Sequence, residues 1–314
     1  MNAIEVHKLT KRFGDYAAVD SLDLLVSQGK TFAFLGPNGA GKTTTLRMMT
    51  GLAKPTSGKV IIGGVEVGRG KPAPIGYLPD TPAFYNWMTA RQFLSYVSQL
   101  HELEKPPVDE TLDQVGLSDA ANKRIGGFSR GMKQRLGLAQ ALLPRPGVLL
   151  LDEPVSALDP GGRKEVLDVM SALRDHMTIF FSTHILNDAE RICDEVAILN
   201  KGRLILQADR EALLARYVRP IFEIDTLPAE ITHLTALVDR IKKLAWVEHT
   251  EMHGAQVRLA VRDVGIAQRE LLPMLAGIPV LRFEMLGATL EDVFLALTRS
   301  EEEPEHAPVL DPVA

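Results

Sequence analysis

The sequence predicts an α/β fold in the first two-thirds of the chain and a small α+β domain in the last third. A short apolar run at 31–35 leads directly into a glycine-rich loop and then into a helical stretch. Two further apolar runs, 147–151 and 178–182, have the length and continuity of strands buried on both faces of a parallel sheet. From about residue 212 the pattern becomes β-α-β-β-α-β, which is the order of a split βαβ, ferredoxin-like unit.

The glycine-rich loop matches the phosphate-loop pattern G-x-x-x-x-G-K-[ST] at every fixed position. Its glycines let the backbone N–H groups point at a polyphosphate, and the following helix adds positive partial charge there. The lysine is expected to reach the β- and γ-phosphates, and the first threonine hydroxyl to ligate Mg²⁺. We therefore predict nucleotide binding by Gly36, Pro37, Asn38, Gly39, Ala40, Gly41, Lys42, Thr43 and Thr44.

Composition limits the classes of protein to consider. The 314 residues suit two domains of unequal size, and 46% hydrophobic with 24% charged residues is ordinary for a globular protein. A net charge of −5 does not favour a nucleic-acid surface. The start of the chain does not read as a signal peptide, and no apolar run approaches the ~20 residues that span a bilayer. Any membrane contact is therefore expected through a partner.

Alternating apolar and polar residues at 4–6 and 22–26 indicate half-exposed antiparallel strands ahead of the loop. Between them lies Phe13, which has two interpretations. It could stack on an adenine base, or it could be a core phenylalanine.

Residues 89–145 are predicted as a mostly helical insertion, opened by a capping-box pattern at Thr89 and Gln92. The loop before it, 79–86, is apolar and aromatic and carries no catalytic motif of its own. We expect this region to contact a partner protein, with three aromatic residues as anchors: Phe84, Tyr85 and Trp87. The alternative is that these residues pack inside the helical insertion.

Further along, Ser129 stands in the N-cap position of a helix, with Gly131 in its first turn. A hydroxyl and a glycine at a helix start make a second anion site, although any capped helix looks similar. The next buried strand ends in Asp152 and Glu153, at the sheet edge where ligands bind. Asp152 is expected to hold Mg²⁺ and Glu153 to act as general base on water; the alternative for either is a loop cap. His184 follows the next strand at the same edge and is expected to touch the γ-phosphate or orient water.

Taken in order, these motifs resemble the ATP-binding cassette (ABC) ATPase family over residues 4–207. Phe13 is similar to the family's adenine-stacking aromatic, 36–44 to its Walker A loop and 128–132 to its signature motif. Asp152 and Glu153 are similar to Walker B and the catalytic base, 156–159 to the D-loop, and His184 to the switch histidine. The resemblance implies a head-to-tail dimer in which Ser129 and Gly131 of one subunit close over ATP held by the other.

The resemblance further implies ATP hydrolysis that drives export through a separate integral-membrane permease. The partners would be that permease and a second copy of this chain or a related ATPase subunit, with the cassette at the cytoplasmic face of the membrane. The alternative is a soluble regulatory cassette ATPase acting on ribosomes or nucleic acid. Such proteins carry two cassettes or a long coiled-coil insertion, and this sequence shows neither. The expected domains are a cassette at 1–211, a regulatory or dimer-stabilising accessory domain at 212–299, and a disordered tail at 300–314.

Two positions depart from the family pattern. The signature is Phe-Ser-Arg-Gly-Met in place of Leu-Ser-Gly-Gly-Gln, and Asp80 replaces the usual glutamine. Asp80 has two interpretations: a stronger Mg²⁺ ligand than the glutamine carbonyl, or a solvated turn residue.

Overall fold

The computed structural model describes residues 1–70, 72–216, 221–287, 289–294 and 297 of the chain. The chain divides into two compact units between Arg210 and Glu211, one residue before the boundary expected from the sequence. Residues 290–294 are helical, so the last helix expected over 290–297 lies only partly within the described residues. The expected tail at 300–314 lies outside them.

The first unit is organised around a six-stranded sheet with strand order β10-β9-β3-β8-β7-β6. The three strands that matter most for the site are buried along their whole length, and they are β3 (Thr31–Leu35), β7 (Val148–Asp152) and β8 (Thr178–Thr183). β6 (Ile75–Leu78) and β9 (Glu195–Asn200) also run parallel to their neighbours β7 and β3, whereas β10 (Arg203–Asp209) is antiparallel to β9. Burial on both faces explains why these strands read as continuous apolar runs.

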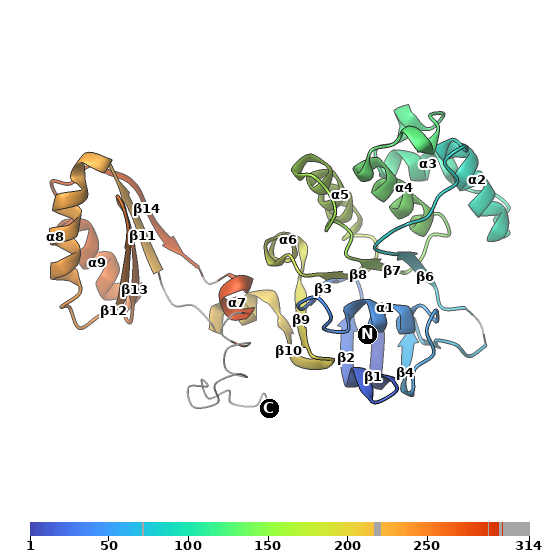
Figure 1. The fold of residues 1–314 in the computed structure, drawn as a ribbon, viewed down its shortest axis with the longest axis horizontal. Helices are drawn as coiled ribbons and strands as arrows, with labels where there is room; N and C mark the ends of the chain where they lie inside the picture. Colours follow the sequence, from blue (N-terminus) through green and yellow to red (C-terminus); the bar gives the residue numbers. More distant parts are fainter. Residues whose placement is uncertain (71, 217–220, 288, 295–296, 298–314) are drawn as a thin grey trace. The chain divides into compact units, whose positions relative to one another are not determined.

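A four-stranded antiparallel sheet with order β2-β1-β4-β5 packs below the first sheet (Figure 1). Its strands are β1 (Asn2–Phe13), β2 (Tyr16–Ser27), β4 (Ser57–Ile62) and β5 (Val65–Glu66). Helix α1 (Lys42–Met49) follows the glycine-rich loop, and its residues Leu46 and Met49 share one core with Ile4 of β1 and Phe34 of β3. The helix that carries the phosphate loop is thus held by both sheets.

The predicted helical insertion contains α2 (Ala90–Leu100), α3 (Val108–Gln114), two 3₁₀ turns and α4 (Arg130–Leu142). Thr89 and Gln92 exchange side-chain to backbone hydrogen bonds, which confirms the capping box. Helix α3 begins directly after Pro107, three residues earlier than the sequence suggested. Ser129 caps α4 as expected, since its Oγ accepts a hydrogen bond from the N–H of Met132.

Helices α5 (Pro160–Leu173) and α6 (Leu186–Ile192) complete the first unit. Pro160 is the first residue of α5, and Asp159 occupies the N-cap position without a capping hydrogen bond from its side chain. The starts of α4 and α5 touch, because a Cβ on Gly131 would lie 3.2 Å from the Cα of Gly162.

The second unit has the predicted β-α-β-β-α-β order. Its elements are β11 (Ile221–Thr226), α8 (Ile231–Ile241), β12 (Val247–His253), β13 (Gln256–Val261), α9 (Val264–Met274) and β14 (Val280–Leu286), preceded by α7 (Arg210–Arg216). The sheet order β12-β13-β11-β14 is fully antiparallel. One face is covered by the two helices, and its core includes Phe222, Ile224, Leu234 and Leu259.

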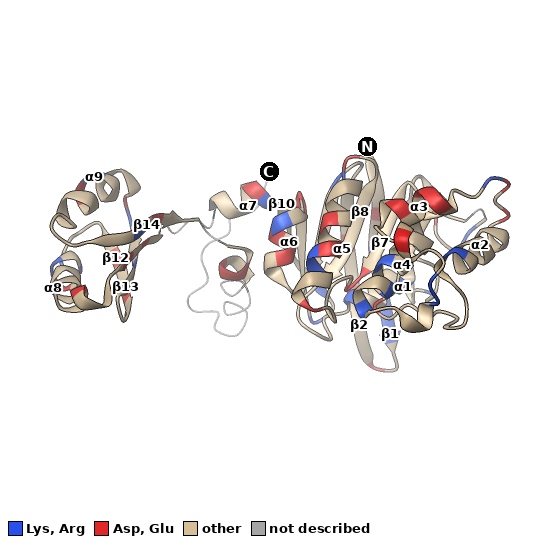
Figure 2. Ribbon diagram, turned by 90° about the horizontal axis from the view of Figure 1, so that it is seen from above, with Lys and Arg blue, Asp and Glu red and all other residues tan. Residues whose placement is uncertain are grey.

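Charges of both signs are interspersed along the elements of each unit (Figure 2). Within the described residues, no helix combines the length and apolarity needed to cross a membrane.

Candidate functional site

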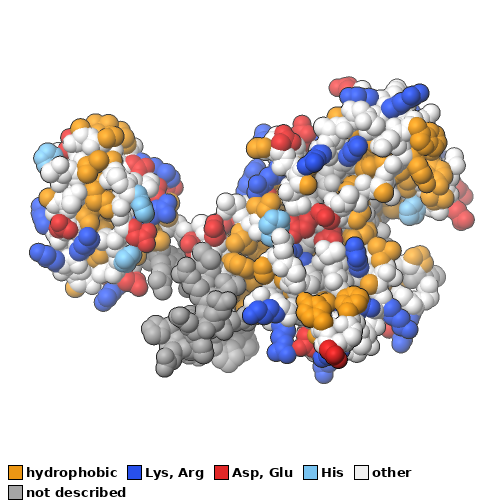
Figure 3. All heavy atoms as spheres, viewed as in Figure 1, with side chains coloured by type: hydrophobic (Ala, Val, Ile, Leu, Met, Phe, Trp, Pro, Cys, Tyr) orange, Lys and Arg blue, Asp and Glu red, His pale blue; other side chains and the backbone are white. Residues whose placement is uncertain are grey.

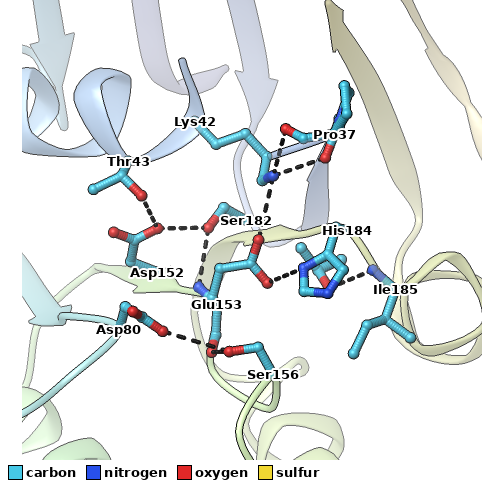
Figure 4. Close-up of polar contacts among 12 residues, drawn as sticks. Pro37, Lys42, Thr43, Asp80, Asp152, Glu153, Ser156, Ser182, His184 and Ile185 are labelled. Atoms are coloured by element: carbon cyan, nitrogen blue, oxygen red, sulfur yellow. Dashed lines mark hydrogen bonds and ion pairs between the residues drawn. The ribbon is translucent and has the colours of Figure 1, made fainter. Parts of the chain in front are cut away.

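Three neighbouring parallel strands of the first unit end at one edge of the six-stranded sheet. β3 leads into the glycine-rich loop, β7 ends in Asp152 with Glu153 next, and β8 ends just before His184. Residues that follow these strand ends line a cavity of about 550 Å³. Lys42, Glu153 and His184 point toward one another there (Figure 4). Ligands of parallel α/β sheets bind at such an edge.

The cavity brings together residues from five separate parts of the chain. Most of the predicted site residues are among those that line it: Phe13, Tyr16, Ala18, Asn38, Gly39, Gly41, Lys42, Thr43, Thr44, Asp80, Glu153, Ser156 and His184. Tyr16 and Ala18 were not identified from the sequence. Among the described residues in this lining, Lys42 is the only lysine or arginine.

Close backbone approach explains the glycines of the loop. Gly41 has φ 107°, and a Cβ there would lie 2.4 Å from the carbonyl oxygen of Ala18. A Cβ on Gly36 would lie 2.4 Å from the carbonyl oxygen of Leu199. Gly36, Pro37 and Ala40 are not lining residues themselves, and the first two act through their carbonyl groups, which accept hydrogen bonds from Lys42.

Lys42 is the centre of the polar network in Figure 4. Its Nζ donates to the carbonyl oxygens of Gly36 at 2.7 Å and Pro37 at 3.2 Å. It also lies 3.3 Å from Oε1 of Glu153, whose other oxygen, Oε2, lies 2.9 Å from Nδ1 of His184. Glu153 is therefore held between a buried ammonium group and an imidazole, which suits a carboxylate that must accept a proton from a positioned water.

Glu153 also has an unusual backbone. Its φ of 47° lies in the left-handed region, which is uncommon for a residue with a side chain. Such conformations persist only where surrounding contacts enforce them, and they cluster at functional sites.

Asp152 is 1% exposed and forms two hydrogen bonds through a single oxygen. Its Oδ1 accepts from Oγ1 of Thr43 at 3.1 Å and from Oγ of Ser182 at 2.8 Å. Burial raises the pKa of Asp152, while the hydrogen bonds from Ser182 and Thr43 oppose that rise. The nearby carboxylates of Asp80 and Glu153 raise the same pKa further.

The oxygen donors at this edge fit Mg²⁺. The Thr43 hydroxyl and the Asp152 carboxylate lie side by side, and hard oxygen ligands with one or two carboxylates are what Mg²⁺ takes in proteins. Asp80 lines the same cavity, where its Oδ1 accepts a hydrogen bond from Oγ of Ser156 at 3.4 Å.

The aromatic residues at the mouth of the cavity are exposed. Phe13 and Tyr16 are 59% and 61% exposed and face each other across the turn between β1 and β2. Lys11 Nζ lies 5.2 Å from the centroid of the Phe13 ring. The interpretation of Phe13 as a core residue is therefore wrong. Tyr16 could have been suspected from its position three residues after Phe13 in a hairpin.

The predicted second anion site is not part of this cavity. Ser129 is exposed at the start of α4, and Gly131 is buried against Gly162. Within one chain, the described residues do not bring the signature motif to the phosphate loop.

The aromatic residues before α2 divide into two groups. Phe84 is partly buried and packs edge-to-face on Phe93, with ring centroids 5.2 Å apart, so it belongs to the insertion's own packing. Tyr85 and Trp87 remain 48% and 67% exposed, and Tyr85 contacts the 37% exposed ring of Tyr96. Hydrophobic side chains gather on this part of the surface, over α2 (Figure 3). We call Tyr85, Trp87 and Tyr96 the aromatic surface; Tyr96 was not identified from the sequence.

Comparison with known proteins gives consistent results along the chain. A family model described as ABC transporter matches residues 19–156. The chain is 41% identical to the uncharacterized ABC transporter ATP-binding protein YxlF of Bacillus subtilis, over 95% of this chain and 100% of that protein. It is 38% identical to the bacitracin transport ATP-binding protein BcrA of Bacillus licheniformis, over 94% and 96% of the two chains. It is 34% identical to the Nod factor export ATP-binding protein I of Burkholderia orbicola, over 95% and 97%.

Solved structures resemble about two-thirds of the chain. The ATP-binding subunit of an ABC transporter is 29% identical with a TM-score of 0.61, and the match covers 68% of this chain and 93% of that one. A dimeric ATP-binding cassette in a post-hydrolysis state, bound to ADP and Pi, is 23% identical with a TM-score of 0.59, over 66% and 98% of the two chains. At that identity the second likeness concerns the fold alone.

Proposed function

The chain belongs to the ABC transporter family as an ATP-hydrolysing, ATP-binding subunit, and from this premise we propose that it drives export through a separate integral-membrane permease. The observation that carries the proposal is the extent of the similarity. The relatives named for bacitracin transport and Nod factor export match more than nine-tenths of this chain, including the second unit. The alternative of a ribosome- or nucleic-acid-directed ATPase is not favoured, because these relatives are transporter subunits.

We assign the chemistry to residues at the cavity. The N–H groups of the loop and the ammonium of Lys42 bind the phosphates of ATP. Glu153 accepts the proton of the attacking water, and His184 holds the Glu153 carboxylate in place and orients the water. Phe13 stacks on the adenine, with Tyr16 across the turn.

The Thr43 hydroxyl, the Asp152 carboxylate and Asp80 are the groups that would hold Mg²⁺. When bound, Mg²⁺ would supply positive charge against the β- and γ-phosphates. The buried Lys42 supplies the protein's own positive charge at the same place.

The working form is proposed to be a head-to-tail dimer with a second copy or a related ATPase subunit. Ser129 is exposed at the N-terminus of α4 and lies apart from its own chain's cavity, so it is available to contact nucleotide held by another subunit. Gly131 keeps the start of α4 close against α5, where a side chain would press on Gly162.

The aromatic surface is proposed as the contact with the permease. Exposed tyrosine and tryptophan in one cluster are typical anchors of protein interfaces. This contact would hold the subunit at the cytoplasmic face of the membrane. The Tyr85→Ser, Trp87→Ser double variant should lose co-purification with the permease while its basal ATPase rate is unchanged.

The matched control is Leu52→Ser, because Leu52 is 70% exposed but lies outside the aromatic surface. It should leave co-purification intact. Equal permease recovery from the double variant and the parent would remove the aromatic surface from the interface, while absence of phosphate release by the parent would contradict the ATPase itself.

The second unit is proposed to stabilise the dimer or regulate it. It has its own core and sheet, so its removal should leave the nucleotide cavity of the first unit intact. Deleting residues 212–314 should weaken ATP-dependent dimerisation, measured by sedimentation, while ATP binding persists. Complete loss of ATP binding in a folded truncation would contradict this division of roles.

A further inference from the structure

The last register pair between β7 and β8 joins Asp152 to Ser182, so both side chains stand at the same level of the sheet edge. Ser182 is fully buried. Its Oγ donates to Oδ1 of Asp152 at 2.8 Å and accepts from the backbone N–H of Glu153 at 3.0 Å (Figure 4). The Ser182 hydroxyl therefore acts as a donor to one acidic residue and as an acceptor from the next.

This arrangement explains how the chain leaves the sheet. Among the described residues, the ladder of β7 and β8 has no register pair beyond Asp152, and the next N–H, that of Glu153, bonds to the Ser182 hydroxyl. The strand can then turn into the left-handed conformation of Glu153 without leaving that N–H unpaired. In this conformation the Glu153 carboxylate lies between Lys42 and His184.

We propose that Ser182 is a positioning residue for ATP hydrolysis, holding Glu153 in its left-handed conformation and tying it to Asp152. The inference rests on the proposed role of Glu153 as general base. Ser182 does not line the cavity, so it acts through the residues it bonds and not on the nucleotide.

The alternative is that Ser182 only satisfies hydrogen bonds in the core. Thr178 is a matched control for that role, because it lies on the same strand, is 1% exposed, and its hydroxyl accepts from the N–H of Gly29 at 2.9 Å. Its hydrogen bond is at the opposite end of β8, away from the cavity. Thr178→Ala thus removes a buried, bonded strand hydroxyl without touching the site.

The experiment measures steady-state hydrolysis, and binding of a fluorescent ATP analogue with and without Mg²⁺, in Ser182→Ala and Thr178→Ala. A displacement of about 1 Å at a reacting group can cost roughly 10²-fold, so kcat of Ser182→Ala should fall by up to that factor. Its affinity for the analogue without Mg²⁺ should stay at the parent value, because the phosphate loop is untouched, whereas Asp152, a proposed Mg²⁺ ligand, loses a hydrogen bond. Thr178→Ala should keep the parent kcat, whatever its loss of thermal stability.

A double-variant cycle gives the second readout. If Ser182 acts through Glu153, adding Ser182→Ala to Glu153→Gln should slow hydrolysis no further, since the positioned base is already gone. If Ser182→Ala does not fold, Ser182→Cys is used for the same test. The thiol has a similar shape and is a weak hydrogen-bond donor, so kcat should fall between that of the parent and that expected without the hydroxyl.

Three outcomes overturn the inference. They are a kcat for Ser182→Ala equal to that of Thr178→Ala, loss of analogue binding with kcat retained, and full additivity with Glu153→Gln. These results differ from failure of the proposed function, which would appear as an inactive parent or as a Glu153→Gln variant with parent turnover.

Discussion

Each unit holds acidic side chains out of solvent, but Glu223 in the second unit and the pair Asp152 and Glu153 in the first are neutralised differently. In the second unit Glu223 stands mid-strand in β11, 3% exposed, with Oε2 accepting from Arg258 Nε at 2.8 Å and Oε1 3.1 Å from Arg282 Nη1. In the first unit Asp152 and Glu153 stand at a strand end beside a cavity, and Lys42 Nζ lies 3.3 Å from Oε1 of Glu153. Burial of a charge therefore does not by itself mark a functional site.

The surroundings of Glu223 and of the cavity differ in how negative charge is balanced by positive charge. Glu223 contacts two arginines, one of which, Arg282, also pairs with Glu284, so its charge is balanced without any ligand. At the cavity the carboxylates of Asp80 and Glu153 lie close enough to act on Asp152, and among the described lining residues the one lysine or arginine, Lys42, pairs with Glu153. Like charges held together repel one another and cost stability, a cost proteins accept where a ligand brings the missing charge. Variants at Glu153, Glu223 and Asp80 test this contrast.

The largest effect should come from Glu153→Gln. The amide keeps the shape of the side chain and can still hydrogen-bond, but it cannot accept a proton, so hydrolysis should fall by ~10²–10⁴-fold. ATP binding should remain, and the ATP-bound form should accumulate as a dimer, measured by phosphate release and size-exclusion chromatography. Glu110→Gln, on an exposed ion pair with Arg145, is the matched control and should turn over like the parent. Parent-like turnover in Glu153→Gln would remove Glu153 from the mechanism.

A smaller effect, on stability alone, is expected for Glu223→Gln. Removing the charge leaves Arg258 and Arg282 without their shared partner, which should lower the free energy of unfolding of the second unit by roughly 1–3 kcal/mol. Chemical denaturation measures this. Glu251→Gln, on the same sheet but 54% exposed, should change it by about 0–1 kcal/mol. If Glu223→Gln changed ATP turnover instead, the buried charge of the second unit would be part of the mechanism and the contrast would fail.

The smallest effect is expected for Asp80→Ala. A carboxylate in the metal shell is a stronger ligand than an amide, so its loss should raise the Mg²⁺ concentration for half-maximal ATPase by a few-fold. Affinity for metal-free ATP should stay equal or improve slightly, since a negative group has left the cavity. Asp109→Ala, which removes a 73% exposed carboxylate from α3, provides the control. Identical Mg²⁺ midpoints for Asp80→Ala and the parent would show that Asp80 is a solvated turn residue.

Local pattern in the sequence determined much of this protein. The sequence alone predicted the loop from Gly36 to Thr44 and the two apolar strands that end at Asp152 and just before His184. It also predicted the capped starts of α2 and α4 and the β-α-β-β-α-β order of the second unit. Each depends on the geometry of a few consecutive residues or on the periodicity of burial. The carboxyl ends of parallel strands lie at one edge of a sheet. The sequence could therefore place Asp152, Glu153 and His184 at that edge.

The tertiary structure alone decided which residues share a contact. Ser182 reads in the sequence as one more residue of a buried strand, and only the register of β8 on β7 puts its hydroxyl between Asp152 and Glu153. Phe84 and Tyr85 are neighbours of the same chemical kind, yet one packs on Phe93 and the other stays at the surface. Glu223 looks like an ordinary strand glutamate until two arginines from β13 and β14 converge on it. These contacts form between segments that are far apart in the chain. The free energy of packing and desolvation at each residue depends on its partners there, and the local sequence does not identify those partners.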